Sequence, residues 1–314
     1  MSVRISNNTM EVFNPATGED LEQISMTTLQ DLNSILQKAQ AGAEKYNYSS
    51  FFRRQKLMTQ FRKGIVKRMD DFVETICSET GKKPDEGLME VFISLEHIKQ
   101  TSHHLYEALG KRNRRSGILK TRKAWVEYEP LGVAGIISPW NYPLILAVSP
   151  LVEALLAGNT VVLKPSEHTP LTTQLLKRVW DESTERPELF QPVYGAGEVG
   201  SALVASPLTD VICFTGSTAI GRKIAEACAP LFKPVILELG GKDPMIILED
   251  ADINRTVDAA IWGGLSNAGQ TCISVERIFA HEKIYPEIVE KLKREIQTLS
   301  SGKGETPIDR KSVV

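Results

Sequence analysis

The sequence has few cysteines, few histidines and almost no excess charge. Its 314 residues carry a formal net charge of −2, with 42% hydrophobic and 24% charged residues, values that are ordinary for a globular chain. A chain of this length is expected to form about two domains. The near-neutral charge gives no electrostatic basis for binding nucleic acid, so we expect no nucleic-acid partner.

The four cysteines form no Cys-x-x-Cys pair, and the five histidines show no His-Glu-x-x-His spacing. These absences favour free thiols in a reducing compartment over disulfides, and they indicate no metal site. No apolar run reaches the roughly 18 residues of a membrane span, and residues 1–6 contain no signal-peptide core. The sequence therefore predicts a cytoplasmic protein without a metal or a membrane partner.

The first third of the chain is expected to form short strands and then helices. Residues 10–25 should form strands around a turn at 14–18, and residues 29–100 should be mostly helical. Two sets of apolar residues at helical spacing support this prediction. The first set is Leu57, Phe61, Ile65 and Met69, and the second is Leu88, Val91, Phe92, Leu95 and Ile98. Residues 111–115 are basic and are expected to form a solvated loop, with an anion-binding patch as the alternative. Residues 123–128 alternate as a strand does.

From residue 133 onward, apolar runs alternate with helical segments. Residues 133–137 are apolar throughout, which is typical of a strand in a parallel sheet that is buried on both faces. Further strands are predicted at 160–164, 191–194, 211–214 and 235–238, with helices at 144–157, 171–180, 199–205 and 220–228. This alternation predicts an α/β fold with a doubly wound parallel Rossmann-like sheet.

A second α/β unit is predicted to begin after this sheet but to stay short. Its expected elements are strands at 244–248 and 277–280 and helices at 253–267 and 285–299.

Two glycine-rich segments join a predicted strand to a predicted helix. Residues 195–200 spell Gly-x-Gly-x-x-Gly, the pattern of a dinucleotide-binding turn. No acidic residue closes a second strand about 20 residues further on, so a tight turn alone is the alternative. The segment at 214–221 is not a P-loop, because Arg222 and Lys223 stand where Lys-Ser/Thr is required. Its backbone amides and the Ser217 hydroxyl can still meet a phosphate at the helix start.

Three more segments offer the groups that acyl chemistry needs: a nucleophile, a base and an oxyanion donor. The segment Gly269-Gln270-Thr271-Cys272 presents a thiol after a turn, and a thiolate can attack a carbonyl carbon. Glu238 ends an apolar run and precedes two glycines, which let backbone and ligand approach closely. Asn141 offers an amide. The plainer alternatives are a buried structural thiol for Cys272, a surface charge for Glu238 and a turn residue for Asn141.

The order and spelling of these motifs resemble the aldehyde dehydrogenase superfamily, from about residue 14 to residue 277. The resemblance implies oxidation of a small-molecule aldehyde to a carboxylic acid, with hydride transfer to NAD(P)+. It implies that Cys272 attacks the aldehyde carbon, and that Asn141 and the backbone N–H of Cys272 hold the oxyanion. It also implies that Glu238 activates the water that hydrolyses the resulting thioester. Which aldehyde is oxidised is left open.

The resemblance further implies NAD as the cofactor, with NADP as the alternative. Lys164 and Glu167 match positions that hold the adenosine ribose hydroxyls, and a carboxylate at Glu167 would repel a 2′-phosphate. Gly216 and Ser217 match the loop that faces the pyrophosphate, and Gly197 lies near the adenosine end. The other implied cofactor contacts are Ile137, Ser138, Trp140, Phe214, Ile220 and Leu239.

On this resemblance, residues 1–240 are expected to form the cofactor-binding domain, with a helical N-terminal part and a bridging strand near 119–130. Residues 241–314 are expected to form the N-terminal part of an incomplete catalytic domain. Chains of this family continue well beyond the position of Leu299 and carry a Glu-x-Phe-Gly-Pro motif that is absent here. We therefore expect a truncated reading frame, an expressed fragment or one piece of a split protein.

The expected truncation bears on both activity and assembly. Intact family members are expected to be homo-oligomers, but this expectation is not extended to this chain. The chain alone should turn over aldehydes slowly. A non-catalytic nucleotide-binding remnant and a subunit partner of an intact homologue are the alternative functions.

Overall fold

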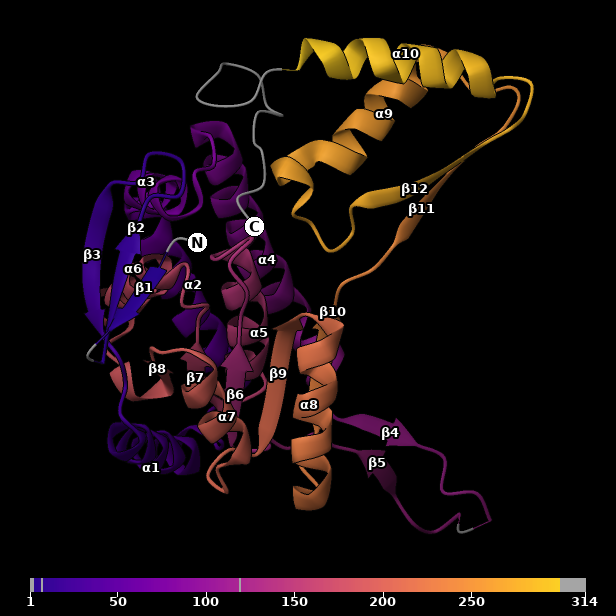
Figure 1. Cartoon of the computed structure of the whole chain (residues 1–314). Helices are drawn as coiled ribbons and strands as arrows, with labels where there is room; N and C mark the ends of the chain where they lie inside the picture. The colour runs from indigo at the N-terminus through magenta and orange to yellow at the C-terminus, as the bar shows by residue number, and fades with distance from the viewer. Residues whose placement is uncertain (1–2, 7, 119, 300–314) are drawn as a thin grey trace.

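The structure is a computed structural model that describes residues 3–6, 8–118 and 120–299, and a five-stranded parallel sheet lies at its centre (Figure 1). Its strands are β6 (Val133–Ile137), β7 (Thr160–Lys164), β8 (Phe190–Pro192), β9 (Val211–Gly216) and β10 (Val235–Leu239). Their order in the sheet is β10-β9-β6-β7-β8, so the predicted doubly wound sheet is confirmed. The order reverses between β6 and β9, and in open α/β sheets ligands bind outside the carboxyl ends of the strands at such a point.

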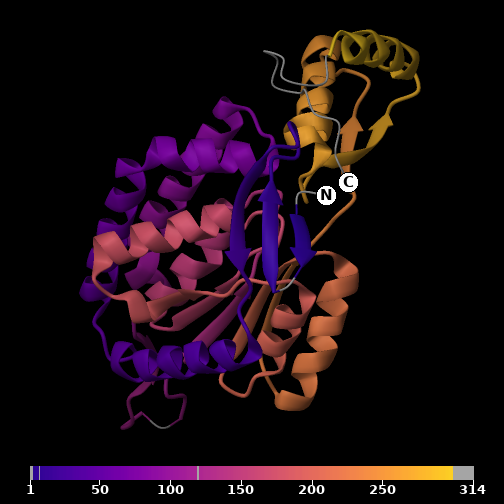
Figure 2. The same ribbon diagram turned by 60° about the vertical axis from the view of Figure 1, so that its left-hand side comes forward.

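Helices cover both faces of this sheet (Figure 2). They are α5 (Ile145–Leu156) and α6 (Pro170–Thr184) on one face, with α1 (Leu29–Tyr46), α7 (Gly197–Ala205) and α8 (Thr218–Cys228) on the other. Along β6, Ala134 and Ile136 pack against α5 and α6, while Val133 packs against α1 and α7. Successive side chains of a strand point to opposite faces, which explains why this strand is apolar at every position.

Three long helices pack around α5 and α6: α2 (Phe51–Lys67), α3 (Met69–Thr80) and α4 (Pro84–Leu109). The first apolar set is buried on α2 as expected, except that Met69 belongs to α3. The chain leaves helical geometry at Arg68, where φ is −112° and ψ is 24°, so the predicted single helix face spans two helices. On α4, Leu88 and Phe92 are exposed, at the edge of the buried stripe. No helix that the structure describes is long and apolar enough to cross a membrane.

Two small antiparallel sheets lie outside the central one. The first joins β1 (Val3–Ser6), β2 (Thr9–Phe13) and β3 (Asp20–Ser25), of which β1 was not predicted. The second is a hairpin of β4 (Arg112–Arg114) and β5 (Ala124–Val126) that extends from the body in Figure 1. The prediction of a loop at 111–115 is wrong for residues 112–114, because these residues form a strand that pairs with β5. Residue 119 of the predicted bridging segment at 119–130 lies outside the described residues.

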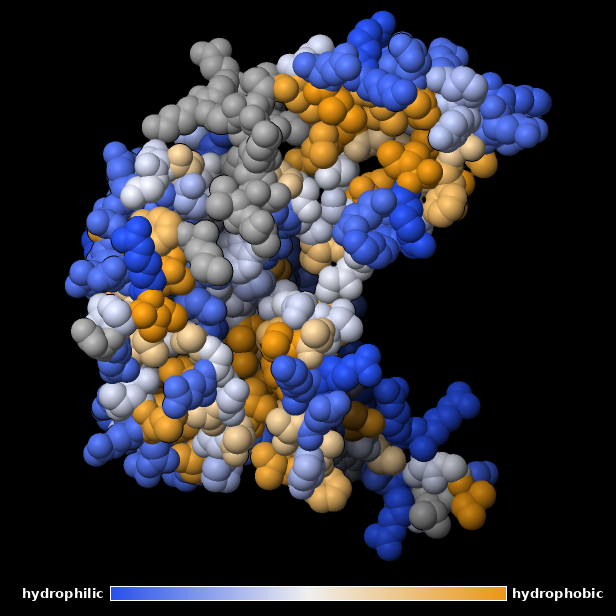
Figure 3. All heavy atoms as spheres, in the orientation of Figure 1, coloured by the Kyte–Doolittle hydropathy of each residue, from blue (hydrophilic) through white to orange (hydrophobic). Residues whose placement is uncertain are grey.

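The C-terminal unit follows β10 and has its own small core. It contains β11 (Asp243–Ile247), α9 (Ile253–Leu265), β12 (Val275–Ala280) and α10 (Tyr285–Thr298), with β11 and β12 paired in parallel. Ile247, Val257, Ile261 and Ile288 form its core. Ile246 and Phe279 are 71% and 55% exposed, and Figure 3 shows hydrophobic side chains gathered over this unit. Residues 300–314 of the predicted catalytic domain lie outside the described residues, and the domain boundary at 240 stays a prediction.

Candidate active site

The loop between α9 and β12 presents Cys272 to solvent. Just before it, Asn267, Ala268 and Gly269 have φ angles of 53°, 58° and 74°. This left-handed geometry suits glycine but is unfavourable for alanine, at about 1–2 kcal/mol per residue. Strained backbone of this kind persists only where the surroundings hold it, and it is concentrated at functional sites. The Ser274 hydroxyl helps to hold the loop by hydrogen bonding to two carbonyls at the end of α9.

Asn141, which follows β6, lies directly against this loop. Its Nδ2 donates to the Gln270 carbonyl at 2.8 Å, and Asn267 Nδ2 donates to the Asn141 carbonyl at 3.1 Å. An amide nitrogen carries two hydrogens, so one of them is left for a second acceptor. The structure therefore brings the predicted oxyanion donor next to the residues that lead into Cys272.

A further contact joins the same two segments and was missed from sequence. The Tyr142 hydroxyl and Thr271 Oγ1 lie 2.9 Å apart. Each residue neighbours a predicted site residue in the chain, and this adjacency was the only signal that could have identified them.

Glu238 lies at the carboxyl end of β10, opposite Thr215 of β9, and is exposed. The chain then runs close to the cysteine loop. A Cβ added to Gly241 would lie 3.3 Å from the Cys272 carbonyl oxygen. The end of β10 and the loop of Cys272 thus come close to each other at Gly241, where an added Cβ would make a tight contact.

Lys164 and Glu167 form an ion pair just beyond β7. Lys164 is buried, and its Nζ donates to the Pro165 carbonyl at 3.0 Å and to Glu167 Oε2 at 3.3 Å. Burial lowers the pKa of Lys164, and Glu167 partly offsets this. Burial alone would raise the pKa of Glu167, but the Lys164 charge and hydrogen bonds outweigh it, so the pKa is lowered. A half-buried carboxylate held in this way can accept hydrogen bonds from sugar hydroxyls.

The residues after β6 and β9 offer polar groups at the same edge of the sheet. Ser138 Oγ is buried and has no hydrogen-bond partner within the part of the chain that the structure describes. Ser217 caps α8 by accepting from the Ile220 amide, and this first turn is exposed. A helix N-terminus with free amides is an anion site. An orphaned hydroxyl and an open helix start fit a bound nucleotide.

The remaining predicted cofactor residues lie around this edge. Phe214 is buried under the turn, where a Cβ on Gly216 would come within 2.5 Å of its ring. Gly197 begins α7, and a Cβ there would meet no atom within 4 Å. The other four predicted cofactor residues lie at the ends of neighbouring elements. Ile137 is the last residue of β6, and Trp140 follows it and is half-buried. Ile220 lies in the first turn of α8, and Leu239 ends β10, where it packs against Gly221.

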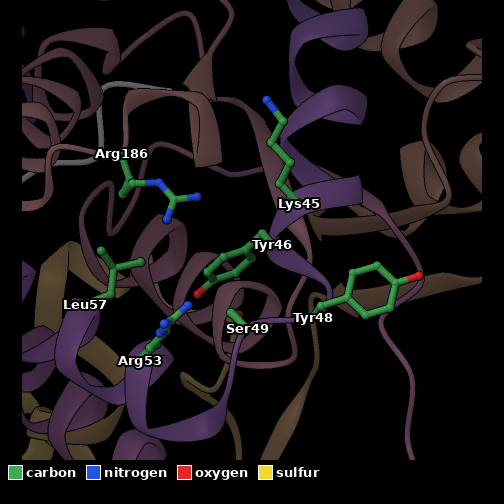
Figure 4. A pocket seen from close by; sticks show the side chains of 7 residues that line it. All are labelled: Lys45, Tyr46, Tyr48, Ser49, Arg53, Leu57 and Arg186. Carbon is green, nitrogen blue, oxygen red and sulfur yellow. The ribbon is translucent and has the colours of Figure 1, made fainter.

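A cavity of about 240 Å³ lies elsewhere, between α1, α2 and the end of α6 (Figure 4). It is lined by Lys45, Tyr46, Tyr48, Ser49, Arg53, Leu57 and Arg186. None of the predicted site residues is among them, so this cavity is separate from the candidate active site. Within the described ranges, no group of three or more His, Cys, Asp or Glu side chains is placed to hold a metal ion.

Comparison with known proteins gives relatives along almost the whole chain. The model of the aldehyde dehydrogenase family matches residues 3–312. The mitochondrial succinate-semialdehyde dehydrogenase of Arabidopsis thaliana is 32% identical over 302 residues, covering 95% of this chain and 56% of that protein. The D-glyceraldehyde dehydrogenase (NADP(+)) of Picrophilus torridus is 30% identical over 314 residues, covering 98% of this chain and 63% of that protein.

A solved structure gives the same result. An aldehyde dehydrogenase of Mycobacterium tuberculosis, complexed with NAD+, superposes with a TM-score of 0.91 at 32% identity, covering 97% of this chain and 63% of that one. The chain thus spans between 56% and 63% of the length of these three proteins. With matches in sequence and in structure along nearly its whole length, the chain belongs to the aldehyde dehydrogenase family.

Proposed function

We propose that this protein oxidises an aldehyde to a carboxylic acid through a thioester on Cys272. The observation that carries the proposal is the contact of Asn141 with the cysteine loop through the Gln270 carbonyl. It ties the Asn141 amide to the loop that carries the exposed Cys272 thiol, next to a strained turn. These are the nucleophile and the oxyanion donor that attack on a carbonyl requires.

The thiolate of Cys272 attacks the aldehyde carbon, and the carbonyl oxygen becomes an oxyanion. The second amide hydrogen of Asn141 and the backbone N–H of Cys272 hold this oxyanion, and one such donor is worth about 3 kcal/mol in the transition state. Two of the other thiols are poor competitors, because burial raises the pKa of Cys213 to about 11 and also raises that of Cys228.

Glu238 is proposed as the general base of the second step. It takes a proton from water, and the water oxygen attacks the thioester carbon, which releases the acid and returns the thiol. Its exposure at the end of β10 gives water access to the carboxylate. The product is therefore a free carboxylic acid.

Bound NAD(P)+ would supply the acceptor for the hydride that leaves the aldehyde carbon. Lys164 and Glu167 would hold the adenosine ribose, and Gly216 and Ser217 the pyrophosphate. Ser138, with its orphaned hydroxyl, would contribute a further hydrogen bond. The Glu167 carboxylate disfavours a 2′-phosphate, so NAD is proposed ahead of NADP. The relatives differ on this point, since one structure is complexed with NAD+ and another relative is named for NADP(+).

The aldehyde is left open, because the named substrates of the relatives range from succinate semialdehyde to D-glyceraldehyde. A cytoplasmic location also stays a prediction.

The test is NADH formation by the protein with a panel of aldehydes, alongside the Cys272→Ala variant. We expect NADH only from the protein that has Cys272. NAD binding without any NADH would instead favour the nucleotide-binding alternative. NADH formation by Cys272→Ala would contradict the proposal.

A further inference from the structure

A buried ion pair lies behind the Asn141 segment. Lys82 Nζ and Glu90 Oε2 are 2.7 Å apart, and the two side chains are 1% and 0% exposed. Lys82 follows α3 and Glu90 lies on α4, so both come from the helical N-terminal part of the chain. A buried pair is weak evidence for stability, because apolar residues of similar volume often do as well. The contacts of the pair with neighbouring segments indicate a second role.

The pair is in contact with the segment that carries Asn141. Glu90 Oε1 accepts from the Leu144 amide at 2.8 Å and from the Ile145 amide at 3.3 Å. The carboxylate therefore satisfies two backbone donors at the start of α5, where negative charge is favoured. Lys82 Nζ lies 4.0 Å from the centroid of the Tyr142 ring, close enough for a cation–π interaction.

These contacts fix the Tyr142 ring from one side, and its hydroxyl meets the cysteine loop on the other. The hydroxyl lies 2.9 Å from Thr271 Oγ1, directly before Cys272. Packing of the ring needs no hydroxyl, and a phenylalanine would bury the same surface. The oxygen adds one specific, directional contact between the body of the protein and the loop.

We propose that Tyr142, held by Lys82 and Glu90, is a positioning residue that fixes the cysteine loop through Thr271. Its effect on catalysis rests on the function proposed above. Its effect on the loop does not, because the contact exists without a bound aldehyde. The hydrogen bond sets the place of the thiol relative to Asn141, and a misplacement of about 1 Å at a reacting group can cost a hundredfold in rate.

The experiment measures amide hydrogen exchange in peptides covering residues 266–276 of the whole chain. The variants are Tyr142→Phe, Thr271→Val, their combination, and Thr271→Ser as the conservative replacement. Tyr46→Phe is the matched control, since it removes a buried tyrosine hydroxyl that has no hydrogen-bond partner in the described ranges.

We expect Tyr142→Phe and Thr271→Val each to speed exchange in this loop by about threefold or more, the size of one hydrogen bond. The combined variant should be no faster than the faster single variant, because both lose the same bond. Thr271→Ser and Tyr46→Phe should match the parent protein, and peptides of β6 should stay unchanged in all variants.

Unchanged loop exchange, equal acceleration along the whole chain, or multiplying effects in the combined variant would each overturn the proposal. Turnover is measured separately. In a preparation that forms NADH, Tyr142→Phe should lower kcat while KM changes by less than about twofold, because the loss affects alignment and not substrate binding. A preparation without turnover would argue against the proposed function and leave the exchange result to decide on the positioning role.

Discussion

Replacing Glu90 by glutamine would test how much the buried ion pair contributes to the fold. The glutamine oxygen can still accept from the Leu144 amide, so the change removes the charge and keeps the shape. The Lys82 ammonium then loses its carboxylate at a site where its side chain is 1% exposed. Breaking a buried pair from one side typically costs about 3–5 kcal/mol. We expect the free energy of unfolding to fall by that amount.

Removing the charge of Lys82 instead should lower the free energy of unfolding by less. In Lys82→Met the Glu90 carboxylate keeps two backbone amide donors at the start of α5, and hydrogen bonds to a charged group contribute about 1.5–3 kcal/mol each. We therefore expect Lys82→Met to cost less than Glu90→Gln. The double variant, which buries neither charge, should recover most of the loss.

The assay is urea unfolding followed by circular dichroism, with Glu127→Gln as the control. Glu127 pairs with Lys111 on the exposed hairpin, where the side chains are 58% and 50% exposed, so its loss should cost less than about 1 kcal/mol. The reasoning is refuted if Glu90→Gln costs no more than the control, or if the double variant is as unstable as Glu90→Gln alone.

Three further predictions concern single carboxylates. Burial raises the pKa of Glu79 from its ordinary value of 4.5 to about 8. Between these two pH values the folded state binds more protons than the unfolded state, so the free energy of unfolding should fall as the pH rises from one to the other. Urea midpoints measured across this range should fall less steeply in Glu79→Gln, and an unchanged slope would contradict this. Glu238→Gln should keep a single-turnover burst of NADH while steady turnover falls, and equal loss of both would place Glu238 in the first step or in folding. Glu167→Gln should shift the ratio of NAD to NADP affinity toward NADP by about tenfold, and calorimetric titrations with an unchanged ratio would argue against Glu167 as the selecting group.

The central sheet was predictable because its inner strands β6 and β7 are buried on both faces and are therefore largely apolar. The strands also alternate with helical segments, an order that favours a doubly wound parallel sheet. The hairpin was not predictable in the same way. Its strand Arg112–Arg114 is wholly exposed and charged, so nothing in its composition favours pairing over a loop, and only the partner β5 settles its conformation.

The site was predictable only in part. Asn141, Glu238 and Cys272 belong to motifs with a recognisable order, so the sequence alone nominated them. The contact of Tyr142 with Thr271 joins segments far apart in the chain, and a single long-range hydrogen bond leaves no periodic pattern. The pair of Lys82 and Glu90 likewise looks like ordinary surface charge in the sequence, and only the structure shows that it is buried.

The most direct measurement is the mass of the protein after it reacts with an aldehyde and NAD+. The Glu238→Gln variant should be used, because slow hydrolysis would let the thioester accumulate. After an acid quench and peptide mapping, we predict a single acyl group on the peptide that contains Cys272, and none when Cys272→Ala is added. An acyl group on Cys77, Cys213 or Cys228, or NADH formed with no acyl group on any cysteine, would contradict the assignment of Cys272 as the nucleophile.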